Sequence, residues 1–446
     1  MNMLITATIA GLAWWPQGRH DAANTGFTYG HGIFGPKPPA IHYVDLVDNA
    51  GNDYGVEMRY GPTVGDIDGD GKNEILVVLG NSNRLYGWLW AFEYGPSGIG
   101  PPVKYPGTPI LYFKVDCAPA LCDVEIGASP GAVDGVPDII WHRGTGQMVE
   151  AVDFYPSPPA PIWPTNNYST GSTVDPSSPT VADLNGDNIH DVVIGSWGVV
   201  RPDGTFLPNI HAIDGATGTA YWTYLYPYPP QQALNTYCRV YSKPAVGDIN
   251  GDGNPEVVYT ECVIYSAKGE GAPPDTMEAE AIPLENISYV RVLSAVSPTP
   301  MLLASFALSV NKPSIQAGWG NPVLTNLDYD SDLEIVVFAQ HERSGSECKD
   351  TVWALDYNGT PYLGVKWRYG INLPNVDDFR AWAYPAVADL NRDGSCDVVV
   401  ADQEGKVHAI DGATGLAFWV TPDLGAKFEA SPAIADLDGD PSDLEV

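Results

Sequence analysis

A stretch near the end of the chain, residues 389–397, places an oxygen-bearing side chain at every second position. Its candidate ligands are Asp389, Asn391, Asp393, Ser395 through its backbone carbonyl, and Asp397. Gly394 has no side chain, so the backbone can curl tightly enough for these oxygens to converge. Alternating carboxylates with one carbonyl are how a short loop supplies the roughly six to eight oxygens that calcium takes. The spacing therefore predicts a calcium-binding loop.

The same spacing recurs along the chain, with the residue in seventh place offering its backbone carbonyl. The further copies are Asp66, Asp68, Asp70, Lys72 and Glu74; Asp183, Asn185, Asp187, Ile189 and Asp191; Asp248, Asn250, Asp252, Asn254 and Glu256; and Asn326, Asp328, Asp330, Asp332 and Glu334. A sixth copy, with Asp436, Asp438 and Asp440, carries one extra residue before its closing acid. A reduced copy at 132–140 has lost most of its ligands. Ordinary turns need only one or two Asp or Gly residues, so the repetition predicts about five to six Ca²⁺ sites.

Each loop lies between two segments that have the pattern of strands. Pro and two small or apolar residues precede most loops, as at 385–387, and a β-branched run follows, as at 398–400. A hairpin pattern comes next, most clearly at 211–218 and 408–415, and then an aromatic strand. Four-stranded units recurring about every 40 to 80 residues predict an all-β fold. We expect a β-propeller of about seven blades, with calcium loops between the first two strands of most blades.

The loops resemble the calcium-binding FG-GAP or VCBS repeats found in the integrin α-chain propeller and in many secreted microbial proteins. The likeness covers the chain from roughly residue 60 to its end. The hairpins and the opening segment 14–21 are similar, more loosely, to the quinoprotein type of propeller repeat. The first resemblance implies that calcium stabilises the architecture and takes no part in chemistry.

The two ends of the chain bear on how the ring closes. Residues 1–13 are apolar and partly β-branched, which predicts an N-terminal strand or assembly segment, or the remnant of an export signal. Residues 14–446 are expected to form a single β-propeller. Val446 falls where the second strand of the last blade should begin. We therefore expect the N-terminal strands to complete that blade, or further residues to follow.

The charge balance limits the classes of partner. The formal net charge is −33, from 55 Asp and Glu against 22 Lys and Arg. Such a chain lacks the basic patches that nucleic acid needs and does not favour anionic lipid. Residues 1–13 are too short to span a bilayer. We expect neither nucleic acid nor a membrane span, and an extracellular or cell-surface location, where free calcium suits loops of modest affinity.

Six cysteines and no CxxC motif are present. An even number in an exported protein predicts disulfides, although six cysteines allow 15 pairings. Proximity along the chain favours Cys117–Cys122, Cys238–Cys262 and Cys348–Cys396. Buried free thiols are the alternative.

Two familiar catalytic motifs are absent from the sequence, which has no HExxH and no P-loop. His211 and His408 share one repeated strand position, as packed or rim histidines would. We therefore expect no enzymatic activity and a structural or adhesive role. Two variants stay open: a module that binds surface proteins or glycans, and a chain that assembles with itself into a fibre by adding strands. The alternative is an extracellular, lyase-like enzyme acting on polysaccharides, whose exposed Trp and Tyr would stack on sugar rings.

Overall fold

The computed structural model describes part of the chain. The described residues are 3–5, 42–44, 63–65, 67, 74–80, 87–95, 98–102, 110–112, 119–124, 136–143, 148–153, 160–163, 168–171, 177–200, 206–227, 235–266, 283–295, 298–309, 320–328, 330, 332–344, 347–373, 384–424, 431–432 and 434. Strands and turns account for all the regular structure in these segments, and none of them is helical. The all-β prediction is thus confirmed for this part of the chain.

Six sheets of four or more strands carry the fold. The first holds β3 (Thr63–Gly65), β4 (Glu74–Gly80), β5 (Gly87–Gly95) and β6 (Gly98–Pro102), with β7 (Ile110–Tyr112) beside β5. The second holds β8 (Ala120–Cys122), β9 (Asp138–Arg143), β10 (Met148–Asp153) and β11 (Ala160–Pro161), with β12 (Tyr168–Ser169) beside β10. The third holds β13 (Thr180–Ala182), β14 (Asp191–Gly195), β17 (Ile210–Ile213) and β18 (Ala220–Tyr224).

The fourth sheet is larger than the others. It holds β20 (Ala245–Gly247), β21 (Glu256–Ser266), β22 (Pro283–Ser294) and β23 (Leu302–Ser309), and is extended by β15 (Trp197–Val200), β16 (Phe206–Leu207) and β19 (Asn235–Arg239). The fifth holds β24 (Pro322–Thr325), β25 (Glu334–Ser344), β26 (Glu347–Asp356) and β27 (Gly364–Leu373). The sixth holds β28 (Ala386–Ala388), β29 (Asp397–Ala401), β30 (Val407–Ile410) and β31 (Ala417–Val420).

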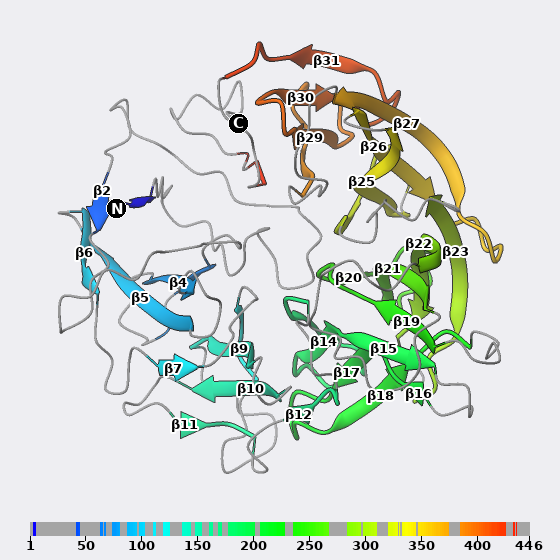
Figure 1. Cartoon of the computed structure of the whole chain (residues 1–446). Coiled ribbons are helices and arrows are strands. Elements are labelled where there is room, and N and C mark those ends of the chain that lie inside the picture. The colour runs from blue at the N-terminus through cyan, green and yellow to red at the C-terminus, as the bar shows by residue number, and fades with distance from the viewer. Residues whose placement is uncertain are drawn as a thin grey trace.

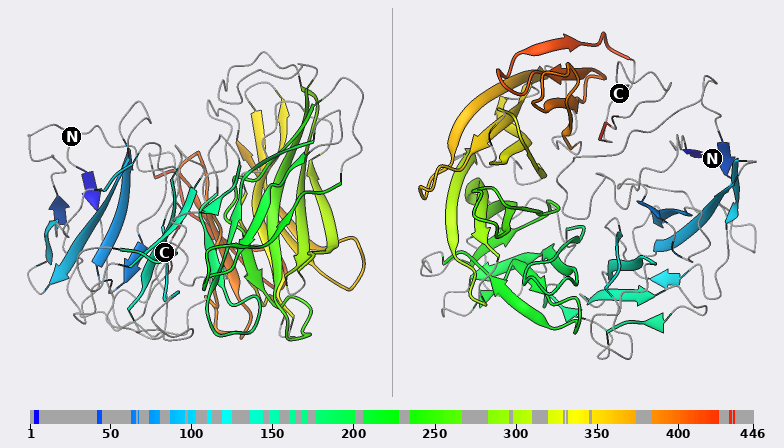
Figure 2. Two further views of the ribbon diagram at one scale, coloured as in Figure 1. Left: turned by 90° about the horizontal axis from the view of Figure 1, so that it is seen from below. Right: turned by 180° about the vertical axis from the view of Figure 1, so that it is seen from behind.

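The sheets follow one another in chain order around a common centre (Figure 1). In the sixth sheet, β29, β30 and β31 lie successively farther from that centre (Figure 1). The view from behind shows the same circular order, and the view from below shows the strands side by side in each sheet (Figure 2). This arrangement is propeller-like. The seventh unit was predicted to begin at Asp436, outside the described residues, so the number of seven blades stays a prediction.

The core lies between neighbouring sheets, because inner strands such as β14, β25 and β29 carry apolar side chains on both faces. On β25, Val336 and Phe338 pack against the sixth sheet, whereas Ile335 and Val337 pack against the fourth. Successive side chains of a strand point to opposite faces, so a continuous apolar run fills two interfaces at once. Burying one such aliphatic side chain contributes roughly 1.5–3 kcal/mol. The short apolar runs seen in the sequence are therefore strands buried on both sides.

Two tryptophans at the outer edges of sheets, one just after β11 and one on β27, fasten their sheets to the next. Trp163 Nε1 donates to the carbonyl oxygen of Gly215 at 2.8 Å, and Trp367 Nε1 donates to that of Gly412 at 2.5 Å. Gly415 lies against the Trp367 ring with φ 72°, and a Cβ there would lie 2.7 Å from ring atoms. The repeated Asp-Gly-Ala-Thr-Gly turn thus receives the indole of the preceding sheet.

Two strands precede the first sheet. β1 (Met3–Ile5) and β2 (His42–Val44) pair with each other in antiparallel fashion. The remainder of segment 1–13 and the loop of the last blade, at 436–440, lie outside the described residues, so the assembly segment and the completion of that blade by the N-terminal strands stay predictions. No helix in the described part of the chain is long and apolar enough to cross a membrane.

The predicted disulfides are not found. Cys122, Cys238, Cys262 and Cys396 are buried free thiols. On β19 and β21, Cys238 lies opposite Val263 while Cys262 lies opposite Arg239. This offset of one residue points the two thiols to opposite faces of the sheet. Cys117 lies outside the described residues, so the argument against a Cys117–Cys122 disulfide rests on the free thiol of Cys122 alone.

The third predicted disulfide fails because of the length of β25. Cys348 pairs with Arg343 at the far end of that strand, whereas Cys396 donates its backbone N–H to Asn326, just before the near end. At about 3.3 Å per residue, the length of the strand separates the two cysteines by far more than a disulfide can bridge.

Candidate metal centres

Each described segment with the predicted calcium-loop spacing joins two strands that pair with each other in one sheet. The loops of the third, fourth and sixth sheets, at 183–191, 248–256 and 389–397, are described throughout. The loop of the fifth sheet, 326–334, is described except for two residues. In the first loop, Asp66, Asp68, Asp70 and Lys72 lie outside the described residues, and only the backbone of Glu74 is described. Asp436, Asp438 and Asp440 also lie outside them.

The loop before β29 shows the local geometry most clearly. Its first carboxylate, Asp389, accepts the backbone N–H of Asp393 at 3.1 Å and that of Gly394 at 2.9 Å. Asn391 Oδ1 accepts the same Asp393 N–H at 2.8 Å, and Asp393 Oδ1 accepts the Ser395 N–H at 2.9 Å. Side-chain oxygens in the first, third and fifth places thus turn inward and hold the backbone in a tight curl.

Two other loops have the same curl. Asp183 accepts the backbone N–H groups of Gly186 at 2.7 Å and Asn188 at 2.9 Å, and Asp248 accepts that of Gly253 at 2.8 Å. The fourth and sixth places have positive φ: Gly186 78° and Asn188 66°, Gly251 71° and Gly253 85°, Arg392 61° and Gly394 95°. Glycine adopts this region without steric cost. Each of these loops places glycine in at least one of its two left-handed positions.

The closing acid of each loop is buried and ties the loop to the sheet. It accepts the backbone N–H from the second place of its own loop: Leu184 to Asp191 at 3.0 Å, Ile249 to Glu256 at 3.1 Å, Leu327 to Glu334 at 2.6 Å, and Leu390 to Asp397 at 3.0 Å. Asp191 and Asp397 each accept a second N–H at 3.0 Å, from Gly215 and Gly412 respectively. The closing acid therefore joins the loop to the turn that receives the neighbouring tryptophan.

Burial dominates the acidity of these closing groups. It raises the pKa of Asp191 and of Glu256 to about 7, with nearby loop acids raising it further and backbone hydrogen bonds opposing. Burial raises the pKa of Asp397 to about 6 in the same way. A cation bound in the loop would favour the charged form of each group.

An apolar residue in the second place anchors most of the loops in the core, and of those described only Leu390 is partly buried; the interpretation of the alternating oxygens did not use this feature. Ile67, Leu184, Ile249 and Leu327 are fully buried there. The signal was present in the sequence as an aliphatic residue directly after each first ligand. This anchor fixes the position of the backbone N–H that the closing acid accepts.

The reduced copy begins earlier than the sequence suggested. Asp138, the first residue of β9, accepts the Val124 N–H at 2.9 Å, as closing acids do in the complete loops. Val124 is therefore the second place and Asp123 the first, not residues near 132. The sequence Pro-Ala-Leu-Cys-Asp-Val at 119–124 matches the approach to the other loops, but a longer connection separates it from its closing acid.

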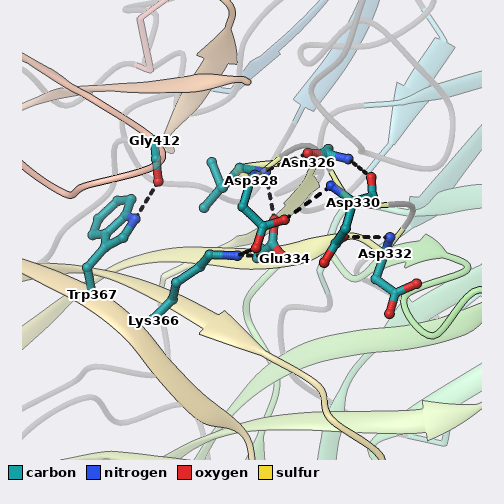
Figure 3. A network of polar contacts seen from close by, with 9 residues as sticks. Asn326, Asp328, Asp330, Asp332, Glu334, Lys366, Trp367 and Gly412 are labelled. Atoms are coloured by element: carbon teal, nitrogen blue, oxygen red, sulfur yellow. Dashed lines mark hydrogen bonds and ion pairs between the residues drawn. The ribbon is translucent and has the colours of Figure 1, made fainter. Parts of the chain in front are cut away.

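The loop of the fifth sheet holds a positively charged side chain. Lys366, on the outer strand β27, places its Nζ in hydrogen-bond contact with Asp328 and 3.0 Å from Glu334 (Figure 3). Asn326 donates its side-chain amide to the backbone carbonyl of Asp330, and its Oδ1 accepts the Asp328 N–H at 3.2 Å (Figure 3). Lysine was not among the residues that the loop spacing identified.

Three acids of this loop lie close together. Asp328, Asp330 and Glu334 each have an oxygen within 4.8 Å of the other two, so this group could hold a metal ion. No other His, Cys, Asp and Glu residues among those described gather in this way. The predicted ligands of the loops at 183, 248 and 389 accept backbone N–H groups, as Asp328 and Asp330 also do. All the predicted ligands of these loops would coordinate through oxygen atoms, which is the donor set that a hard cation requires.

The two repeated histidines are buried parts of the sheet contacts. His211 Nδ1 lies 3.0 Å from the Tyr168 hydroxyl, and its Nε2 lies 3.0 Å from Ser196 Oγ. His408 Nδ1 lies 3.1 Å from the Tyr369 hydroxyl of the preceding sheet. The expectation of packed histidines agrees with this burial and with these contacts.

Comparisons with known proteins give similarity of fold only. No protein-family model matches the chain, and no curated protein matches it. Among solved structures it is similar to BamB from Moraxella catarrhalis, with 12% identity over 86% of this chain and 85% of that one, at a TM-score of 0.38. The quinohemoprotein alcohol dehydrogenase from Comamonas testosteroni shows 12% identity over 97% and 76%, at 0.43. At such TM-scores the propeller-like fold rests on the sheets themselves, and the FG-GAP resemblance stays an interpretation of the loops.

The expectation that the chain is not an enzyme needs correction. Its structural neighbours include the alcohol dehydrogenase above and the Bacillus licheniformis rhamnogalacturonan lyase PL11, which is 13% identical over 79% of this chain and 60% of that one, at a TM-score of 0.32. Both of these proteins are enzymes. The lack of those two catalytic motifs therefore does not place this chain among non-enzymes, and likenesses this distant assign no reaction to it.

Proposed function

We propose that the chain is an extracellular or cell-surface β-propeller whose loops bind calcium and whose role is structural or adhesive. The observation that carries the proposal is the repeated loop closed by a buried acid. In four sheets the closing acid accepts the N–H of the second loop residue. Alternating oxygen ligands at this spacing suit calcium. In this proposal the ligands are the residues predicted from the sequence.

Calcium in these loops would act on stability. Each loop gathers acids beside a buried closing carboxylate, whose charged form is unfavourable without a counter-charge. A cation bound by the folded chain alone stabilises it by about 2.7 kcal/mol per site at a hundredfold excess over its Kd. The effect would reach the contacts between sheets, because Asp191 and Asp397 also hold the turns that receive Trp163 and Trp367.

Thermal unfolding with and without calcium tests this proposal. We expect EDTA to lower the Tm sharply and calcium to restore it, while magnesium at the same concentration restores it less. Isothermal titration should give Kd values of roughly 10⁻⁴–10⁻³ M, the range of extracellular calcium modules. An identical melting curve in EDTA and in calcium would refute structural calcium. Submicromolar affinity would contradict the extracellular location.

Self-assembly is the variant that a further observation favours. Trp367 is 8% exposed because it docks on the sixth sheet, whereas Trp419, at the equivalent register of β31, is 42% exposed. Phe418 and Val420 are 42% exposed and Leu416 is 70% exposed on the same segment. We propose that a second copy of the chain covers this exposed apolar edge strand in an assembled fibre.

Sedimentation velocity and electron microscopy in calcium test the assembly. We expect the wild-type chain to associate and Trp419→Ser to remain single. Tyr362→Ser is the matched control, because Tyr362 is a 73% exposed aromatic residue away from β31 and its loss should leave association unchanged. Single particles of the wild-type chain at every concentration would rule out the fibre.

A further inference from the structure

We propose that the loop at 326–334 carries its own cation, the Lys366 ammonium, and binds no calcium while that lysine is present. The inference rests on the proposed calcium function of the other loops. The ammonium contacts Asp328 and lies 3.0 Å from Glu334, the loop's closing acid. It therefore lies between the third and ninth places, where the sequence pattern puts a calcium ion (Figure 3).

A β-bulge directs Lys366 toward the loop. Trp367 pairs with Ala354, and Val365 pairs with Leu355, so Lys366 is the extra residue between two paired positions. Bulges commonly redirect a side chain in this way. Its neighbour Trp367 points to the next sheet, where it donates to Gly412. The outer strand β27 thus holds the next sheet with Trp367, and the residue just before it, Lys366, fills the loop of its own sheet.

The same bulge occurs in other sheets with uncharged residues. By register, the extra residue is Tyr221 on β18, Leu303 on β23 and Phe418 on β31. Burial raises the pKa of Tyr221, and the nearby charges of Asp191 and Asp214 raise it further, so this position lies near the loop region there as well. Lysine occurs at the position in the fifth sheet alone among these four, which makes the loop cation a local substitution and not a general feature.

The arrangement of the acids agrees with a resident cation. Acids repel one another unless positive charge lies between them. Asp328, Asp330 and Glu334 are the only described group of three acids with oxygens within 4.8 Å of one another, and theirs is the described loop that holds an ammonium. In the loops at 183, 248 and 389, the first place is an aspartate that accepts backbone N–H groups from the far side of the loop, as Asp389 does from Asp393 and Gly394.

The loop sequence itself departs from the calcium pattern in two places. Asn326 replaces the first aspartate: its Oδ1 still accepts a backbone N–H, but its amide also donates to the Asp330 carbonyl, which a carboxylate could not do. Tyr329 and Ser331 occupy the fourth and sixth places, where the three complete loops have at least one glycine. A tethered ammonium needs only a few acceptors, whereas calcium needs about six to eight oxygens from a tightly curled loop.

The decisive experiment counts calcium ions per chain by equilibrium dialysis with ⁴⁵Ca²⁺, on the full-length protein. We expect Lys366→Met to bind one calcium more than the wild type. Lys406→Met is the matched control: Lys406 pairs with Glu404 at 2.9 Å away from any loop, and its loss should leave the number unchanged. Equal numbers for the wild type and Lys366→Met would overturn the inference.

A second pair of variants keeps the test independent of the folding of Lys366→Met. In the wild-type background, Asp328→Asn should leave the calcium number unchanged, whereas Asp393→Asn in the loop before β29 should lower it by one. A loss of one ion in both variants would show that calcium displaces the lysine. A wild-type chain that binds no calcium would refute the proposed function itself, which separates that failure from the failure of the inference.

Discussion

The loops at 326–334 and 389–397 lie on neighbouring sheets and close in the same manner. Glu334 and Asp397 are both buried, and each accepts the N–H of the leucine in the second place. They differ in what balances the acids: Lys366 contacts the first loop, whereas no lysine among the described residues contacts Asp397, the buried closing acid of the second, which has a pKa of about 6. In our proposal, one loop architecture accommodates two kinds of counter-charge, a lysine of the same chain and a calcium ion from solution.

The comparison predicts that calcium stabilises the chain more as the pH rises, which is the largest effect we expect. The pKa of Asp191 and Glu256 is about 7, and that of Asp397 about 6, in the calcium-free fold, against ordinary values of about 4. An acid whose pKa is raised in the folded state stabilises the fold fully at pH values below its pKa in the unfolded chain. This stabilisation is lost as the pH rises through 6 to 7. Since one pKa unit is about 1.4 kcal/mol, the loss is on the order of a few kcal/mol for each acid.

The measurement is the difference in unfolding free energy between calcium and EDTA, by chemical denaturation at pH 4.5 and 7.5. Buried His142 and His211, whose pKa burial lowers to about 3, act in the opposite direction, but they cancel in this difference. We expect the gain from calcium to be larger at pH 7.5. A gain that is equal at both pH values would show that the closing acids are not the groups that calcium keeps charged.

The closing acids of the two loops differ in the number of backbone N–H groups that they accept, so removing one of them tests its role as a tie. Asp397→Ala leaves two buried N–H groups, of Leu390 and Gly412, without their acceptor. At about 1–3 kcal/mol for each lost partner, we expect a loss of roughly 2–6 kcal/mol in urea unfolding. Asp397→Asn retains one acceptor oxygen and should lose about half as much. Equal stability of the alanine variant and the wild type would contradict the role of the acid as a tie between loop and turn.

Part of this comparison could be predicted from the sequence. The alternation of oxygen side chains and the apolar runs beside it are local patterns, and both loops lie between strands where those patterns placed them. The all-β, propeller-like fold followed from repeating the same local unit. These features depend on residues within a few positions of one another, which is the range over which a sequence pattern is informative.

The remainder depends on contacts between distant residues. Lys366 lies 32 positions from Glu334, and a bulge in β27 brings the two together, which no local pattern encodes. The first place of the reduced loop, Asp123, was missed because a long connection separates it from Asp138. The disulfide prediction failed because the offset between β19 and β21 determines the faces on which Cys238 and Cys262 lie.

Transferring the lysine to another sheet sharpens the comparison. Tyr221 occupies the bulge position of β18, near Asp191. Tyr221→Lys should therefore place an ammonium at the loop 183–191, remove one calcium per chain, and stabilise the calcium-free fold by about 1–2 kcal/mol through charged hydrogen bonds. Tyr221→Met is the control for loss of the ring. If the lysine variant binds as many ions as the wild type, a bulge lysine is not sufficient to replace calcium.

The smallest effect concerns the curl that distinguishes a calcium loop from the loop with the lysine. Gly253 has φ 85°, and a Cβ added there would meet no atom within 4 Å, so Gly253→Ala changes backbone preference alone. We expect a loss of roughly 1 kcal/mol in EDTA and a further loss of calcium affinity. Gly359→Ala is the matched control, with φ 77°, equally open space and no loop. It should lose similar stability and leave calcium binding intact. If both variants bind calcium like the wild type, the left-handed position is a feature of the turn and not of the metal site, and the missing glycines of loop 326–334 lose their significance.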